Sequence, residues 1–160
     1  MSPVHSSPAA APHRRQRLTG PSALARVLGV AGLLPFFFSA ATVWLVGPQD
    51  GLPVAALLAY AALIASFLGG IHWGLAMRDS HADAAQLLWG VSPSLLGWVA
   101  VLLPPRWGLL LAPATLIACY AVDRHLYLRL GLGAWLGLRA GLTVVASVCC
   151  ALGALALWMR

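Results

Sequence analysis

Five apolar segments, each long enough to cross a lipid bilayer, make up most of this 160-residue chain. Almost all of its ionisable residues lie in the amino-terminal tail or in the short connections between these segments. Hydrocarbon offers no water to bond the backbone N–H and C=O groups, so apolar runs of roughly 20 residues cross it as α-helices. The chain is 61% hydrophobic and 9% charged, whereas soluble domains are about 25% charged. We therefore expect an all-α, polytopic membrane protein, a bundle of five transmembrane helices.

Prolines, glycines and charged residues predict where these helices begin and end. Pro35 should kink the first helix, and Pro93 and Pro113 lie inside the third and the fourth. The stretch from Asp123 to Leu136 should be a partly apolar connection at the membrane interface. The helices form one domain, residues 23–160, and are predicted at Leu24–Val46, Pro53–Met77, Ala84–Leu103, Trp107–Val122 and Gly137–Met159.

Residues 1–22 precede the first helix and are rich in Pro, Ala and Ser, with Arg14, Arg15 and Arg17 and no acidic residue. Such a segment cannot bury an apolar core, so we expect a disordered, basic tail in the cytosol. The same composition also matches a mitochondrial transit peptide, which stays open as an alternative.

Arginines beside the helix ends predict the orientation, because short positively charged loops stay in the cytoplasm. Only Arg106 and Arg160 lie on the far side, and eight lie on the amino-terminal side: Arg14, Arg15, Arg17, Arg26, Arg78, Arg124, Arg129 and Arg139. We expect the amino terminus inside and the carboxyl terminus outside. The chain has no lysine, glutamate or asparagine, a bias that favours a GC-rich bacterial source. The expected location is the bacterial inner membrane, with the mitochondrial inner membrane as the alternative.

Three polar residues, His72, Asp123 and Arg139, lie near the cytoplasmic ends of three different helices. Ionisable residues within a span are costly and mark functional sites by default. Arg139 needs an anionic partner, and Asp123, predicted at the end of the fourth helix, lies at the same membrane level. If the bundle brings the three together, they form one polar, ligand-binding cluster. The structural alternatives are that His72 bonds a backbone carbonyl, Arg139 extends to lipid head groups and Asp123 caps a loop.

Small residues form a stripe on two of the helices. Ser66, Gly70 and Gly74 align on the second helix, and Gly137 and Gly141 form a GxxxG pair on the fifth. Such stripes let another helix approach closely, so we assign these five residues to helix packing. His72 points away from its stripe, which predicts that the second helix is central in the bundle.

The sequence favours no enzymatic class, because it has no nucleophile–base pairing, metal-ligand spacing or glycine-rich phosphate loop. We predict no catalytic residue, no metal site and no cofactor. Cys119, Cys149 and Cys150 lie in predicted helices without a C-x-x-C spacing and are interpreted as small apolar residues. Haem between two helices stays open through one pair, His72 and His125. The basic residues that give the net charge of +6 flank apolar runs and form no exposed basic cluster. This pattern excludes nucleic acid as a binding partner.

Several motifs occur in a characteristic order: LGVAGLLPF at 28–36, SFLGGIHWG at 66–74, VSPSLLGW at 91–98, Asp123, and LRAGLT at 138–143 after Trp135. In this order the chain resembles the transmembrane protein 69 family, a domain of unknown function found in bacteria and in mitochondria. The resemblance covers most of the chain beyond the tail. It implies a small multi-spanning inner-membrane protein and carries over no catalytic residue.

Two functions remain. The first is an accessory or assembly subunit, whose small-residue faces dock on another membrane protein or on a second copy of the chain. The second is a membrane protein that binds a lipophilic or anionic small molecule in a pocket around His72, Asp123 and Arg139. In both cases the lipid bilayer is the environment of the protein.

Overall fold

The computed structural model describes residues 20–47, 51–78 and 83–159. These residues form α1 (Ala23–Ala31), α2 (Leu34–Val46), α3 (Leu52–Ala76), α4 (Ala84–Leu102), α5 (Pro105–Arg129), a 3-10 turn η2 (Gly133–Trp135) and α6 (Leu136–Trp158). The expected all-α fold is confirmed. Five helical segments of the described chain are long and apolar enough to cross a membrane, and α1 and α2 together make the first of them. Of the predicted tail at 1–22, only residues 20–22 belong to the described part.

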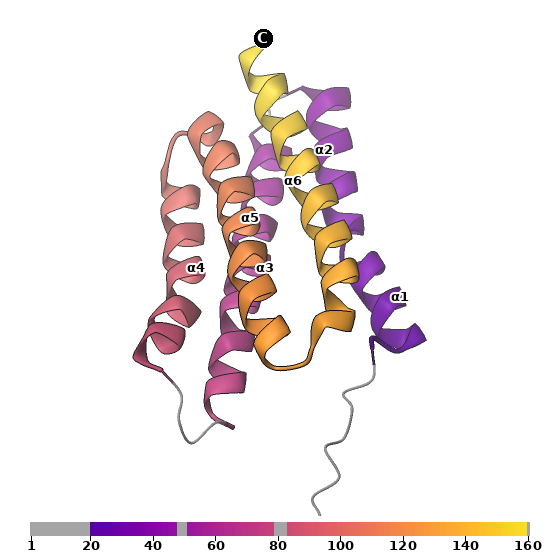
Figure 1. Ribbon diagram of the computed structural model, residues 1–160. Coiled ribbons are helices and arrows are strands. Elements are labelled where there is room, and N and C mark those ends of the chain that lie inside the picture. The colour runs from indigo at the N-terminus through magenta and orange to yellow at the C-terminus, as the bar shows by residue number, and fades with distance from the viewer. Residues whose placement is uncertain (1–19, 48–50, 79–82, 160) are drawn as a thin grey trace, which may run out of the picture.

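The spans run side by side along one bundle axis (Figure 1). Helix α3 contacts α2, α4, α5 and α6, so the prediction that it is the central helix is confirmed. The start of α1 and the end of α6 lie at opposite ends of the bundle, as an odd number of spans requires (Figure 1).

The first span is broken rather than continuous. Helix α1 ends at Ala31, and Pro35 lies in the first turn of α2, where its missing N–H leaves no helical bond unmade. The hydroxyl of Tyr60 on α3 donates to the carbonyl of Gly32 at 2.8 Å and thereby ties the break to the central helix. No residue of α1 is buried, so α1 lies over the bundle as a loosely packed half-helix.

Helix α5 is longer than predicted. It continues to Arg129, seven residues past Val122, so the expected interfacial connection from Asp123 to Leu136 is wrong over its entire first half. The charged run after Val122 suggested a loop, but a helix tolerates such a run when its one buried charge is paired. The helix ends where Gly131 adopts φ +74° and the N–H of Leu132 donates back to the carbonyl of Tyr127 at 2.7 Å. Glycine takes this left-handed conformation without a steric penalty, which makes it the usual residue just past a helix end.

Helices α3 and α4 pack backbone against backbone. A Cβ atom added to Gly69 would collide with the carbonyl oxygen of Gly90, and one added to Gly90 would collide with the ring of Trp73. Small residues allow this close approach. In a bilayer the hydrophobic effect does not drive helices together, so the van der Waals contacts made at such close approaches stabilise their packing. The two glycines fix the position of the last turns of α3, where His72 lies.

Candidate functional site

The bundle brings together the three polar residues that the sequence singled out. His72 comes from α3, Asp123 from α5 and Arg139 from α6. The His72 Nε2 atom lies 2.8 Å from Asp123 Oδ1, and Arg139 Nε donates to Asp123 Oδ2 at 2.9 Å, with a second bond from an Nη atom to the same oxygen. His72 is 2% exposed and Asp123 1%, while the Arg139 side chain is 11% exposed. We call this group the polar triad.

The longer α5 places Asp123 deeper than expected. It lies six residues before the end of α5, roughly 9 Å along the helix axis, rather than at a helix end. Its carboxylate can only accept hydrogen bonds, so the His72 ring donates from Nε2 and Arg139 donates from the other side. The paired charges of Asp123 and Arg139 compensate each other where water does not reach them.

Helix α4 adds a contact that sequence reasoning missed. The side-chain amide of Gln86 donates to the backbone carbonyl of His72 at 3.1 Å, and the indole N–H of Trp73 donates to the carbonyl of Leu87 at 3.1 Å. These reciprocal bonds hold the last turns of α3 against the first turns of α4. Gln86 is the one amide side chain of α4, and its isolation in an apolar helix was the available signal.

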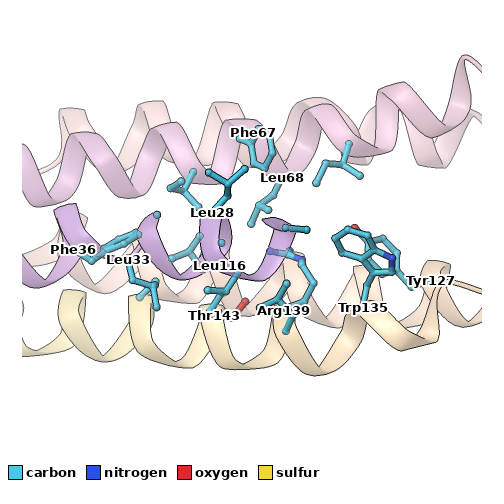
Figure 2. A pocket seen from close by; sticks show the side chains of 18 of the residues that line it. Leu28, Leu33, Phe36, Phe67, Leu68, Leu116, Tyr127, Trp135, Arg139 and Thr143 are labelled. Atoms are coloured by element: carbon cyan, nitrogen blue, oxygen red, sulfur yellow. The ribbon is translucent and has the colours of Figure 1, made fainter. Parts of the chain in front are cut away.

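An apolar cavity of about 530 Å³ lies beside the triad, between α1, α2, α3, α5 and α6. Figure 2 shows the Arg139 side chain reaching into it, with Tyr127 and Trp135 toward one end and Phe36 toward the other. We call it the apolar pocket. Nearly all of its lining is hydrocarbon, and Thr143, one helical turn from Arg139 on α6, adds a buried hydroxyl to the wall.

The pocket involves the triad differently from the prediction. We expected a cavity built around all three residues, but of the three only Arg139 lines it. His72 and Asp123 lie behind Arg139 and hold its guanidinium in place. They therefore position the cationic group and do not face the cavity.

The pocket opens sideways. Leu28 on α1 and Phe67 on α3 both line it, yet they are 62% and 65% exposed. Exposed apolar side chains on transmembrane helices face lipid acyl chains. The exposed edge of the pocket between α1 and α3, which we call its mouth, is therefore apolar and suited to contact lipid.

The predicted packing glycines do not pack within this chain. A Cβ added to any of Gly70, Gly74, Gly137 or Gly141 would meet nothing within 4 Å among the described residues. Ser66 donates its hydroxyl to the carbonyl of Ala62 in its own helix at 3.0 Å. Other glycines make the close approaches inside the bundle: Gly69, Gly90, Gly97, Gly108 and Gly153.

The haem alternative is wrong in its geometry. His125 follows Asp123 by two positions, which turns its side chain about 200° around α5, and it is exposed on the outer surface. It cannot face His72. In the part of the chain that the structure describes, no three His, Cys, Asp or Glu side chains are grouped to hold a metal ion. Cys119, Cys149 and Cys150 are buried free thiols.

Known proteins are similar to most of this chain. Residues 21–155 match the family described as "Protein of unknown function (DUF3429)". The chain is 35% identical over 125 residues to transmembrane protein 69 of Xenopus tropicalis, across 74% of this chain and 49% of that protein. It is 37% identical over 82 residues to transmembrane protein 69 of Mus musculus, across 48% and 33% of the respective lengths. The matched part is thus half or less of these curated relatives, and no solved structure matches.

Proposed function

This chain belongs to the DUF3429 family, as its motifs predicted, and we propose that it binds an amphipathic small molecule with an apolar body and an anionic head. It is a multi-pass membrane protein, and in this proposal its role is binding rather than catalysis. The ligand would enter from the bilayer through the mouth between α1 and α3.

The observation that carries this proposal is a single fixed cation on the wall of an apolar pocket. Ligand sites are typically cavities of about 300–1,000 Å³ lined by apolar groups, with a few polar groups that orient the ligand. The apolar pocket, at about 530 Å³, lies within that range. Arg139 supplies the orienting group, and Thr143 adds a hydroxyl one turn away.

Arg139 keeps donors for a ligand while it is paired. A guanidinium carries five N–H donors, and the two bonds to Asp123 Oδ2 use two of them. The remaining donors suit the oxygens of a carboxylate, sulfonate or phosphate. Because Asp123 and His72 fix the guanidinium from behind, little rotamer entropy is lost on binding.

The distribution of charge supports an amino terminus inside and a carboxyl terminus outside. Among the described arginines, only Arg106 lies at the far end of the bundle, and the others lie at the end that holds the triad: Arg26, Arg78, Arg124, Arg129 and Arg139. By the positive-inside rule, the pocket then lies in the cytoplasmic half of the membrane. We propose the bacterial inner membrane as the location, with the mitochondrial inner membrane as the alternative.

Purification from native membranes followed by mass spectrometry of the bound small molecules tests the proposal. The key variant combines Asp123→Asn with Arg139→Gln, which removes the cation without leaving a lone buried carboxylate. Arg124→Gln is the matched control, since Arg124 is exposed at the same end of the bundle. We expect the unmodified chain and the control to retain an acidic amphiphile and the double variant to lose it. Equal retention by all three proteins would refute the proposal.

A second function, docking on another membrane protein or on a second copy, is favoured by the outward glycines. Gly70 and Gly74 on α3 and Gly137 and Gly141 on α6 leave room for a helix that this chain does not supply. Gly70→Leu should release a partner from a gently solubilised complex without loss of thermal stability. Recovery of the unmodified protein only as a lone monomer would count against an accessory or assembly role.

A further inference from the structure

We propose that the apolar pocket takes its ligand as an acid, one anion together with one proton, and that His72 holds the proton. This inference rests on the proposed function, because it concerns the ligand that Arg139 would bind. It adds to that proposal the chemical class of the ligand and a dependence of binding on pH.

The argument begins with the charges of the empty triad. With His72 in its neutral form, the positive charge of Arg139 and the negative charge of Asp123 cancel, so the triad as a whole is neutral. An anionic head at Arg139 adds a second negative charge beside Asp123. Two anions would then share one cation at a site from which water is excluded, an unfavourable arrangement. One proton added to the triad restores neutrality.

His72 can take that proton at Nδ1, because Nε2 already carries the hydrogen that bonds Asp123. Its Nε2 bonds Asp123 through Oδ1, whereas Arg139 bonds the same carboxylate through Oδ2. When an anion in the pocket shares the guanidinium with Asp123, the carboxylate therefore keeps a second partner on its other oxygen. A protonated imidazole strengthens that bond, because both donor and acceptor are then charged. Gln86 holds the backbone of His72 while this happens.

Asp123 is the one other group in contact with His72 that could take the proton, and the His72 variant described below separates the two; the remaining titratable groups nearby do not compete. Cys119 and Tyr127 lie one turn on either side of Asp123 on α5, and both are buried. A thiol and a phenol are already protonated in their neutral forms and can only lose a proton. Helix α4, which packs on α3 beside His72, contains no titratable residue between Ala84 and Leu102. Arg139 on α6 stays charged at any physiological pH.

Linkage then sets the expected pH dependence. If binding takes up one proton, the affinity for an ionised ligand falls as pH rises. The fall is about tenfold per pH unit wherever His72 is neutral in the empty protein and charged in the loaded one. Binding is measured from roughly pH 5 to 8, the range in which an unperturbed histidine changes its charge. A neutral ligand should bind without any proton.

Calorimetric titration of the full chain in lipid nanodiscs tests the inference. Dodecanesulfonate is the anionic probe, because its head group stays ionised throughout this range, and dodecanol is the neutral probe of the same chain length. Titrations in two buffers of different ionisation enthalpy give the number of protons taken up per probe bound, and empty nanodiscs correct for partition into lipid. We expect uptake of about one proton with the sulfonate and none with the alcohol.

Two variants assign the proton to its residue. His72→Gln keeps an amide donor for Asp123 but has no group to protonate, so the sulfonate should bind more weakly, without proton uptake and with no pH dependence. His125→Gln is the matched control, since that exposed histidine lies near the same end of the bundle. It should behave like the unmodified chain.

The outcomes separate this inference from the proposed function. Sulfonate binding with no proton uptake would overturn the inference and leave the proposed pocket standing. Proton uptake that persists in His72→Gln would overturn the assignment to His72. Failure of the sulfonate to bind would overturn the proposed anionic ligand, and the inference with it.

Discussion

Two adjacent glycines of α3 should respond in opposite ways to the same substitution. Gly69 faces the backbone of α4, whereas Gly70 faces outward. Gly69→Ala should destabilise the bundle, and Gly70→Ala should leave it as stable as before or slightly more so. The pair differs by one position in the same helix, so each variant is the control for the other.

The expected size of the difference follows from the packing. A Cβ on Gly69 would lie under 3.0 Å from the carbonyl oxygen of Gly90, so α3 and α4 must move apart, whereas a Cβ on Gly70 meets nothing within 4 Å. Forcing an extra carbon into a packed interface costs about 1–3 kcal/mol. The gain in helix propensity from Gly to Ala, about 1 kcal/mol, is common to both variants and cancels in the comparison. For a chain of this size the difference corresponds to roughly 2–12 °C in melting temperature.

Thermal unfolding in a mild detergent, followed by the loss of the monodisperse peak in size-exclusion chromatography, measures this difference. We expect Gly69→Ala to melt below the unmodified chain and Gly70→Ala at or above it. Equal melting temperatures for the two variants, or a lower value for Gly70→Ala, would show that α3 and α4 do not pack through Gly69.

Three further changes probe the triad and the helix ends. Asp123→Ala should lower the free energy of unfolding by about 3–5 kcal/mol, because it leaves Arg139 buried without its carboxylate. Adding Arg139→Met should recover more than half of that loss in denaturant titrations, and an unchanged loss would contradict a paired charge. Tyr60→Phe should lower the free energy of unfolding by about 0.5–1.5 kcal/mol in the same assay, because it removes the hydrogen bond to Gly32. An unchanged value would mean that this bond does not stabilise the break in the first span. Gly131→Ala should cost about 1–2 kcal/mol, because alanine at φ +74° is strained, and an unchanged midpoint would rule out that conformation.

The five spans and the triad were predictable from the sequence. Bilayer thickness sets the length of an apolar run that can cross the membrane, and the cost of a buried charge requires that the charge has a partner. A long apolar run has one stable conformation in lipid, and an arginine in such a run must find a carboxylate. Asp123, predicted at the end of the fourth helix at the level of Arg139, was the natural partner. The end of α5 was missed because the charged run after Val122 suggested a loop, whereas the helix continues to Arg129 with Asp123 paired inside the bundle.

The packing glycines and the pocket were not predictable, because both depend on how helices are rotated and tilted against one another. Gly69 and Gly70 point about 100° apart, and nothing in their neighbours tells which of them faces α4. The pocket lies beneath α1, which follows its own direction because the first span is broken between α1 and α2. Pro35 predicted where the first span bends, but the direction of the bend depends on the positions of the other helices.

The sideways mouth between Leu28 and Phe67 alters what affinity means for this protein. For a molecule that arrives through lipid, the concentration that determines occupancy of the pocket is its concentration in the membrane. For an amphiphile this concentration is far above that in water. For the proposed ligand, partition would thus perform the first selection, and the protein would only have to discriminate among molecules of one leaflet. A weak dissociation constant, expressed as a mole fraction of lipid, would still keep the cavity filled. Competition with the surrounding phospholipids, rather than solubility, would then decide which molecule occupies it.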